Sequence, residues 1–240
     1  VMRSPSEIPL SRHLNMHVAN IPTMCPIEPD AISDRQVRET YDRIGTHFAK
    51  TRPEPWPAIE RFLEARSGRI GLDVGVGNGR HAEILAERTD RVVGLDMSER
   101  VLATARTRAV ERGFGLELCV GNAAALPIAT GSIDIAVYIA TIHHLSPRDR
   151  RVTSLDELAR VLREEGVAIV SAWSVSHDRF DRRHGFDTVI DWTLPNGETV
   201  PRYYHIYDLE EFRTDLAESR ARVVESFEST GNCFAVIEGT

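Results

Sequence analysis

Residues 69–88, "RIGLDVGVGNGRHAEILAER", constrain the fold more than any other stretch of this sequence. An apolar strand runs directly into a glycine-rich turn, and the turn leads into a helix whose apolar residues fall on one face. Glycines at positions 75, 77 and 79 allow the backbone to turn tightly and to approach a ligand where any Cβ would collide. The stretch therefore predicts one unit of a doubly wound α/β sheet, with a binding site at the turn.

The segments that follow predict more of the same pocket. A second strand, "RVVGLDMS", ends in Asp96, where a carboxylate can accept hydrogen bonds from both hydroxyls of a ribose. Ser98 then caps a helix that ends at Gly113. A third strand, "LELCV", leads to "GNAAALPI", and a fourth reads "IDIAVYIA". A dinucleotide fingerprint would have glycine at position 80, where this sequence has Arg80.

The spacing G-x-G-x-G after Asp73 resembles motif I of class I S-adenosylmethionine methyltransferases. The resemblance implies that S-adenosyl-L-methionine is the cofactor. At Asn122 this family usually has an acidic residue that meets the adenine amino group, although asparagine can still accept through its carbonyl oxygen. The cofactor-binding residues that the resemblance implies are Asp73, Gly75, Gly77, Asn78, Gly79, Asp96, Met97, Asn122, Ala123 and Ala140.

The end of the chain completes the expected architecture. Two runs, "ARVVESFES" and "NCFAVIEGT", are joined by a short "TG" turn and predict a closing hairpin. We expect an α/β, Rossmann-like class I methyltransferase fold with a seven-stranded, mostly parallel sheet whose last strand is antiparallel. The expected organisation is an N-terminal arm over residues 1–33 and a methyltransferase domain over 34–240, with a substrate-side insertion at about 174–207.

Three further segments point to an acceptor. They are "YDRIGTHFAKTRPEPWPAIERFL", "HHLSPRDRR" and "PRYYHIYDLEEF". Together they resemble the tRNA methyltransferases that esterify the 5-carboxymethyl group of the wobble uridine, over about residues 41–239. The yeast-type enzyme and the methyltransferase domain of its animal counterpart share this set. The resemblance implies methyl esterification of 5-carboxymethyluridine at tRNA position 34. A small-molecule acceptor and a non-catalytic adenosylmethionine-binding scaffold stay open as alternatives.

A carboxylate acceptor would need positioning rather than a general base. Its pKa is near 4, so it is already ionised at pH 7. Arginine suits the task because its planar guanidinium binds a carboxylate with two parallel hydrogen bonds and also stacks on bases. The expected catalytic residues are His143, Arg52, Arg151, Arg202, Tyr204 and His205.

The stretch "PRYYHIY", residues 201–207, cannot present all its side chains to one pocket. In a strand, Tyr203 and His205 would lie on one side, and Arg202, Tyr204 and Ile206 on the other. A hydrophobic lid is the competing interpretation of its tyrosines.

Charge and cysteine usage limit the partners. The net charge of −7 disfavours a free-standing nucleic-acid binder, although arginine clusters such as "SPRDRR" can form a local basic face. The resemblance implies tRNA and a small zinc-binding activator protein, which would pair with the sheet edge near Leu116–Val120. The three cysteines are far apart and form no C-x-x-C pair, which argues against a metal site and favours a cytoplasmic location. No run of about 18 apolar residues predicts a membrane span.

Overall fold

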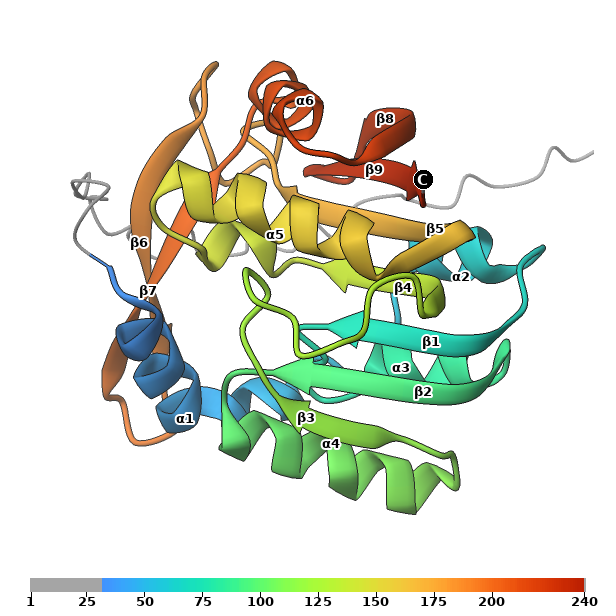
Figure 1. The fold of residues 1–240 in the computed structure, drawn as a ribbon. Coiled ribbons are helices and arrows are strands. Elements are labelled where there is room, and N and C mark those ends of the chain that lie inside the picture. Colours follow the sequence, from blue (N-terminus) through green and yellow to red (C-terminus); the bar gives the residue numbers. More distant parts are fainter. Residues whose placement is uncertain (1–31, 240) are drawn as a thin grey trace, which may run out of the picture.

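The computed structural model describes residues 32–239, so most of the predicted arm lies outside the described residues. A seven-stranded sheet forms the centre of the molecule, with strand order β3-β2-β1-β4-β5-β9-β8 (Figure 1). Strand β9 pairs antiparallel with both β5 and β8, and the remaining pairs are parallel. This confirms the predicted sheet. Its strands are β1 (Gly68–Val74), β2 (Thr89–Asp96), β3 (Glu117–Val120), β4 (Ile133–Ile139), β5 (Leu162–Trp173), β8 (Arg222–Ser229) and β9 (Asn232–Glu238).

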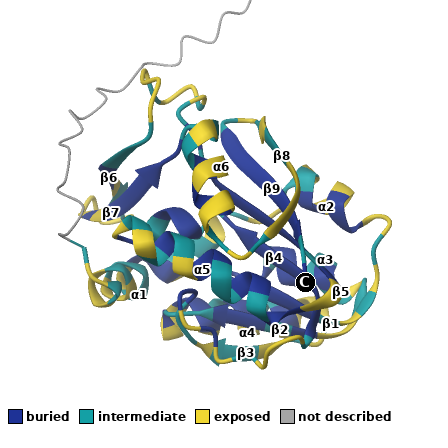
Figure 2. Cartoon of the chain, turned by 45° about the horizontal axis from the view of Figure 1, so that its top comes forward, coloured by how far each residue is buried: buried dark blue, intermediate teal, exposed yellow. Residues whose placement is uncertain are grey.

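Helices cover both faces of this sheet, as expected for a parallel sheet buried on both sides. One face packs on α2 (Pro57–Leu63), α3 (Arg80–Ala86) and α4 (Glu99–Arg112), and the other on α5 (Arg148–Val161) and α6 (Leu209–Glu218). Every residue of β4 is buried: Ile135 and Val137 pack toward the first group of helices, and Ala136 and Tyr138 toward the second. Figure 2 shows the central strands β4 and β9 as buried, and exposed residues on the edge strand β8, on outer helix faces and on loops.

Local signals in the sequence set the ends of these helices. Ser98 Oγ accepts a hydrogen bond from the N–H of Val101 at the start of α4, and the helix ends at Gly113, whose φ is 74°. Asp208 caps α6 in the same way by accepting from the N–H of Glu211. The start of α4 after Ser98 and its end at Gly113 agree with the sequence-based prediction.

Helix α1 (Asp34–Lys50) packs against α4 and against strand β7 (Thr199–Ile206). It begins with a capping box, in which Ser33 and Gln36 each bond the other's backbone N–H. Close approach to α4 requires Gly45, because a Cβ there would lie 2.9 Å from a methyl carbon of Val101. Figure 1 shows α1, in blue, beside the orange β7.

The predicted insertion contains a β-hairpin that sequence analysis did not anticipate. Strands β6 (Phe186–Thr193) and β7 form a separate two-stranded antiparallel sheet. The missed signal was "PNG", residues 195–197, between two alternating runs; Gly197 has a φ of 85°. The hairpin places β7 next to the carboxyl end of β5, since the N–H of Tyr207 donates to the carbonyl of Trp173 at 2.9 Å.

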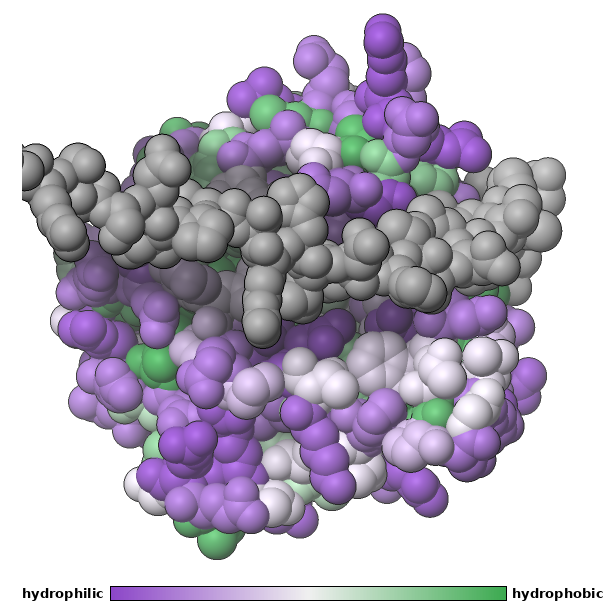
Figure 3. All heavy atoms as spheres, turned by 180° about the vertical axis from the view of Figure 1, so that it is seen from behind, coloured by the Kyte–Doolittle hydropathy of each residue, from purple (hydrophilic) through white to green (hydrophobic). Residues whose placement is uncertain are grey.

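The surface of the described part is unremarkable on the face in Figure 3, where hydrophilic residues predominate and hydrophobic spots are small and separate. Between residues 32 and 239, no helix is both long and apolar enough to cross a membrane. The same residues contain no group of three or more His, Cys, Asp or Glu side chains that could hold a metal ion.

Candidate active site

A cavity of about 590 Å³ lies at the carboxyl ends of the parallel strands. Its first half is formed by the turns after β1, β2, β3 and β4. These turns contribute Gly75, Val76, Gly77, Asn78, Asp96, Met97, Gly121, Ala123, Ala140 and Thr141. Its second half is formed by α1, the segment before α2, the 3-10 turn at Ile142–His144, the end of β5, and β7. These elements contribute Tyr41, Phe48, Arg52, Trp56, His143, His144, Trp173 and Tyr204.

The glycine turn shapes the first half of the cavity. Gly75 has a φ of +72°, and a Cβ there would lie 2.1 Å from Thr141 Oγ1. Gly77 has a φ of +58°, and the nearest atom to its would-be Cβ is the carbonyl oxygen of Gly75 at 3.9 Å. Gly75 therefore lets the turn pack against the segment after β4, and Gly77 leaves open space for a ligand.

Two carboxylates, the buried Asp73 and the half-buried Asp96, make this half of the cavity acidic. Asp96 accepts hydrogen bonds from the N–H groups of Gly77 at 3.2 Å and Ser98 at 3.0 Å, and burial raises its pKa to about 6. Asp73 is 1% exposed, and its Oδ2 has no hydrogen-bond partner among the described residues. Burial, with a smaller contribution from Asp96, raises the pKa of Asp73 to about 7. A cationic nucleoside ligand fits such a site because it would stabilise both ionised carboxylates.

Two guanidinium groups lie at the second half: Arg52 lines the cavity, and Arg202 lies behind its wall. Arg202 is 5% exposed, lies 4.8 Å from the Trp192 ring centroid, and donates a hydrogen bond to the hydroxyl of Tyr204. Arg52 lies 4.8 Å over the ring of Phe48 and 5.8 Å from that of Trp192. Between residues 32 and 239 neither arginine forms an ion pair with a carboxylate.

Burial lowers the pKa of Arg52, and the charge of nearby Arg202 lowers it further. Buried like charges without an anion are unfavourable. This end of the cavity therefore favours an anionic group.

The two neighbouring histidines are both neutral. His144 Nδ1 donates to the carbonyl of Tyr203 at 2.9 Å, so its Nε2 accepts from the hydroxyl of Tyr41 at 2.7 Å. His143 Nδ1 accepts from the N–H of Trp173 at 3.0 Å. Burial lowers the pKa of His144 to about 3 and that of His143 well below its ordinary value. His144 therefore links α1 to β7 as a structural group.

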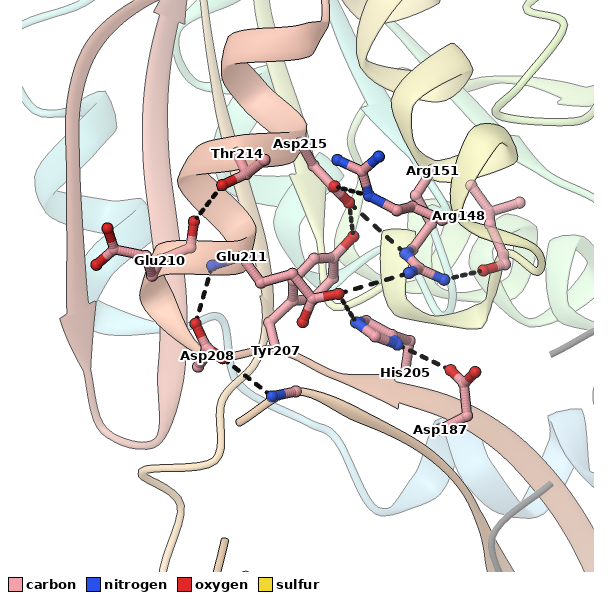
Figure 4. A network of polar contacts seen from close by, with 12 residues as sticks. Arg148, Arg151, Asp187, His205, Tyr207, Asp208, Glu210, Glu211, Thr214 and Asp215 are labelled. Carbon is pink, nitrogen blue, oxygen red and sulfur yellow. Dashed lines mark hydrogen bonds and ion pairs between the residues drawn. The ribbon is translucent and has the colours of Figure 1, made fainter. Parts of the chain in front are cut away.

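Arg151 and His205 lie outside the cavity lining, in contrast to the expectation for these two residues (Figure 4). His205 is held between Asp187 and Glu211, with 2.8 Å from each ring nitrogen to a carboxylate oxygen. Arg151 is 3% exposed and contacts Asp215 at 3.7 Å. The physical reason is strand alternation, because His205 lies on the face of β7 opposite to the cavity-lining Tyr204. The network joins α5, α6, β6 and β7.

The pKa of His205 predicts a pH-dependent contribution to stability. Burial alone lowers this pKa, but the hydrogen bonds to Asp187 and Glu211 outweigh burial and raise it. A histidine whose pKa is raised in the folded state contributes its full stabilisation below pH about 6.5. This contribution is lost as the pH rises through the raised value. The substitution His205→Gln should therefore lower the free energy of unfolding, measured by urea denaturation. The difference from wild type should be largest at pH about 6 and should shrink as the pH is raised to about 9.

The matched control is His184→Gln, because the side chain of His184 is 93% exposed and lies 3.9 Å from Asp208. This control should leave the free energy of unfolding nearly unchanged across the range. A constant difference between wild type and His205→Gln would contradict the assigned ion pairs.

The remaining sequence-predicted residues divide into two sets. Those that line the cavity are Gly75, Gly77, Asn78, Asp96, Met97, Ala123, Ala140, His143, Arg52 and Tyr204. Asp73 and Gly79 lie beside the glycine turn without lining the cavity, and Asn122 contacts Asp34 of α1. Arg202 borders a smaller cavity of about 290 Å³ between α1 and β7.

Among the residues that line the larger cavity and that sequence analysis missed are Asp34, Tyr41 and Trp173. The ring of Trp173 stacks on Tyr204 with centroids 5.0 Å apart and an interplanar angle of 16°. The signal available was its place at the end of a buried strand, where parallel sheets bind ligands. No comparable signal marked Asp34.

Comparison with known proteins shows which class of protein this chain belongs to. A family model described as "Methyltransferase domain" matches residues 72–170. The 1,6-didemethyltoxoflavin-N1-methyltransferase of Burkholderia thailandensis, solved with 1,6-didemethyltoxoflavin and S-adenosylhomocysteine, has the same fold. Its TM-score is 0.69 at 18% identity, covering 90% of this chain and 95% of that one. The fold is that of a Rossmann-like methyltransferase.

Sequence relatives narrow the class. The tRNA (carboxymethyluridine(34)-5-O)-methyltransferase of Saccharomyces cerevisiae is 31% identical, over 69% of this chain and 59% of that protein. The mouse enzyme ALKBH8, with the same activity name, is 37% identical over 61% of this chain and 21% of its own length. A putative methyltransferase of Encephalitozoon cuniculi is 31% identical over 88% of this chain and 99% of its own length. The chain belongs to the methyltransferase family that these relatives represent, and it spans about a fifth of the mouse protein.

Proposed function

We propose that this protein uses S-adenosyl-L-methionine to methylate the carboxylate of 5-carboxymethyluridine at the wobble position of tRNA. The observation that carries the proposal is the electrical asymmetry of one cavity. At one end Asp96 lines the cavity and Asp73 lies buried beside the glycine turn; at the other end Arg52 lines the cavity and Arg202 lies behind its wall, and neither arginine pairs with a carboxylate between residues 32 and 239. A positively charged methyl donor and a negatively charged acceptor would each find the matching end. The activity named for the yeast and mouse relatives supports the same assignment.

The residues of the first half would bind the donor. Asp96 can accept hydrogen bonds from ribose hydroxyls, and the open space at Gly77 admits the ligand close to the backbone. Asp73 would balance positive charge from beneath the turn. When bound, the donor supplies a methyl group on a positively charged sulfur.

The residues of the second half would orient the acceptor. A carboxylate with a pKa near 4 is ionised at pH 7, so no side chain has to remove a proton from it. Burial lowers the pKa of His143 and of His144, so neither side chain is a strong base. The guanidinium of Arg202 can hold the carboxylate, and the stacked rings of Trp173 and Tyr204 offer a surface for an unpaired base.

Local charge answers the objection that a chain with a net charge of −7 should avoid nucleic acid. Arg52, Arg61 and Arg80 line the cavity, and Arg202 lies behind its wall. The pKa of Arg80 is lowered to about 10 by burial and then by Arg52, which shows how closely these cations are grouped. The field at the cavity, rather than the sum over the chain, decides whether an anionic substrate is attracted.

The experiment that tests the function measures methyl transfer to tRNA that carries 5-carboxymethyluridine, with nucleoside mass spectrometry as the readout. We expect the methyl ester to form, at a rate nearly independent of pH above about 6 because the acceptor is already ionised. A rate that rises steeply toward pH 8 would show an amine or hydroxyl acceptor. Turnover of small acceptors with none of tRNA would establish the competing small-molecule function.

We also propose that the edge of the sheet at β3 binds a small activator protein by strand addition. Strand β3 stands at the end of the strand order, and Val120 is 52% exposed. A putative methyltransferase solved in complex with the Haloferax volcanii Trm112 activator shares the fold, at a TM-score of 0.62 and 17% identity. A cytoplasmic location belongs to the same proposal, supported by the free thiols of Cys119 and Cys233. Failure of a Trm112-type protein to co-purify with this chain would contradict the partner.

A further inference from the structure

The loop after β3 lies where the adenine of the donor would be read. Asp96 ends β2, and β3 is the next strand in the sheet, so the loop after β3 lies beside the ribose-binding carboxylate. Met97, Gly121 and Ala123 line the cavity at this end. A base attached to a ribose held by Asp96 would extend toward these residues. The exocyclic amino group of adenine is a hydrogen-bond donor, so it needs an acceptor here.

Asn122 is poorly placed to be that acceptor. Its Oδ1 already accepts a hydrogen bond from the N–H of Ala124 at 2.9 Å, and its Nδ2 donates to Asp34 Oδ2 at 2.6 Å. Together the two contacts fix the orientation of the amide, because a flipped amide would bring Nδ2 against an N–H and Oδ1 against a carboxylate. Asn122 does not line the cavity, and its Oδ1 keeps only one free lone pair of a neutral amide, a weaker acceptor than a carboxylate.

Asp34 supplies the missing negative charge from a different part of the chain. It lies in the first turn of α1 and lines the cavity itself. Its Oδ2 is held by Asn122 and by Arg150, whose Nη2 is 2.5 Å away. Its Oδ1 receives no hydrogen bond from any residue between 32 and 239. Two fixed partners therefore orient one oxygen and leave the other available.

We propose that Asp34 is the adenine-recognising carboxylate of this protein, in place of the acidic residue that would otherwise occupy position 122. Asp34 accepts a hydrogen bond from the 6-amino group of the donor, and Asn122 and Arg150 hold the carboxylate in position. The inference rests on the proposed use of S-adenosylmethionine, but it is independent of which acceptor is methylated.

Direct binding of S-adenosylhomocysteine tests this inference without any turnover. A calorimetric double-mutant cycle compares wild type and Asp34→Asn for this ligand and for its analogue whose base is purine, which lacks only the 6-amino group. Wild type should bind S-adenosylhomocysteine about tenfold more tightly than the purine analogue, because a hydrogen bond to a charged group is lost. Asp34→Asn should bind the two ligands within about twofold of each other.

The ratio between the affinities for S-adenosylhomocysteine and for its purine analogue tests the role of Asp34, even if the variant binds both ligands more weakly. Loss of the first-turn carboxylate can weaken docking of α1, but it would then weaken binding of both ligands equally. A ratio in Asp34→Asn that equals the wild-type ratio overturns the proposal. Absence of any ligand binding to the wild-type protein would instead contradict the proposed function itself.

The exchanged pair Asp34→Asn with Asn122→Asp provides the rescue. It keeps one carboxylate and one amide in contact, so it should restore the preference for S-adenosylhomocysteine over the purine analogue to within about threefold of wild type. The matched control is Glu39→Gln, which removes one negative charge from an exposed position of the same helix. This control should keep the wild-type ratio. A ratio that collapses in the control as well would show a general charge effect and would overturn the assignment.

Discussion

Replacement of Arg202 with alanine should lower kcat/KM for tRNA at least about a hundredfold, while the dissociation constant for S-adenosylhomocysteine changes less than about threefold. The guanidinium is buried and has no acidic partner among residues 32–239, so a carboxylate ligand would provide the anion that it lacks. Removing it removes both attraction and orientation of the acceptor carboxylate. Steady-state kinetics with tRNA and calorimetry with the donor product measure the two effects separately.

Two variants distinguish a role of Arg202 in holding the acceptor carboxylate from a role in stabilising the β6–β7 hairpin. Arg202→Lys keeps the charge but lacks the planar fork, so it should recover only part of the lost activity. Arg43→Ala removes an exposed arginine that pairs with Glu198 between β6 and β7, and it should change kcat/KM little. Donor affinity and kcat/KM that fall by equal factors in Arg202→Ala would show that Arg202 is structural.

Substitution of Gly75 by alanine should destabilise the protein by about 3 kcal/mol and weaken donor binding at least about tenfold. The residue has a φ of +72°, and its new Cβ would lie 2.1 Å from Thr141 Oγ1 and 2.5 Å from Thr141 Cγ2. The turn would have to move away from the segment after β4, and the shape of the cavity would change with it. Urea denaturation and calorimetry measure the two losses.

Gly113→Ala is the matched control for this substitution. Gly113 also has a positive φ, +74°, but nothing lies within 4 Å of its would-be Cβ. Gly113→Ala should lower the free energy of unfolding by only about 1 kcal/mol, the penalty for placing alanine at a positive φ, and it should leave donor binding intact. Adding Thr141→Gly to Gly75→Ala removes the clash, so the double variant should be more stable than Gly75→Ala alone. Equal losses in Gly75→Ala and Gly113→Ala would contradict the packing role of Gly75.

The donor half could be predicted from the sequence because its determinants are local. Gly75, Gly77 and Asp96 each follow a buried strand within a few residues, and parallel strands bring their carboxyl ends together. The alternation of side chains between the two faces of β7 is also a local property. It correctly predicted that Tyr204 and His205 lie on opposite faces. That alternation also argued against placing Arg202, Tyr204 and His205 in one pocket.

The contacts of α1 with the rest of the cavity could not be predicted because they join distant segments. Tyr41 and His144 are 103 residues apart in sequence, and Asp34 and Asn122 are 88 apart. No periodicity or motif relates such positions; only the packing of α1 between α4 and β7 brings them together. Arg151 was misplaced for the same reason, since its carboxylate partner Asp215 lies on another helix.

The two halves of the cavity draw mainly on different parts of the chain. The glycine turn and the loops after β2, β3 and β4 lie within the stretch that the general methyltransferase model matches, residues 72–170, whereas α1, with Asp34, and the β6–β7 hairpin lie outside it. Mutations in these flanking elements can remodel the acceptor wall without disturbing the glycine turn. Such an arrangement allows new acceptors to evolve on an unchanged methyl-donor platform.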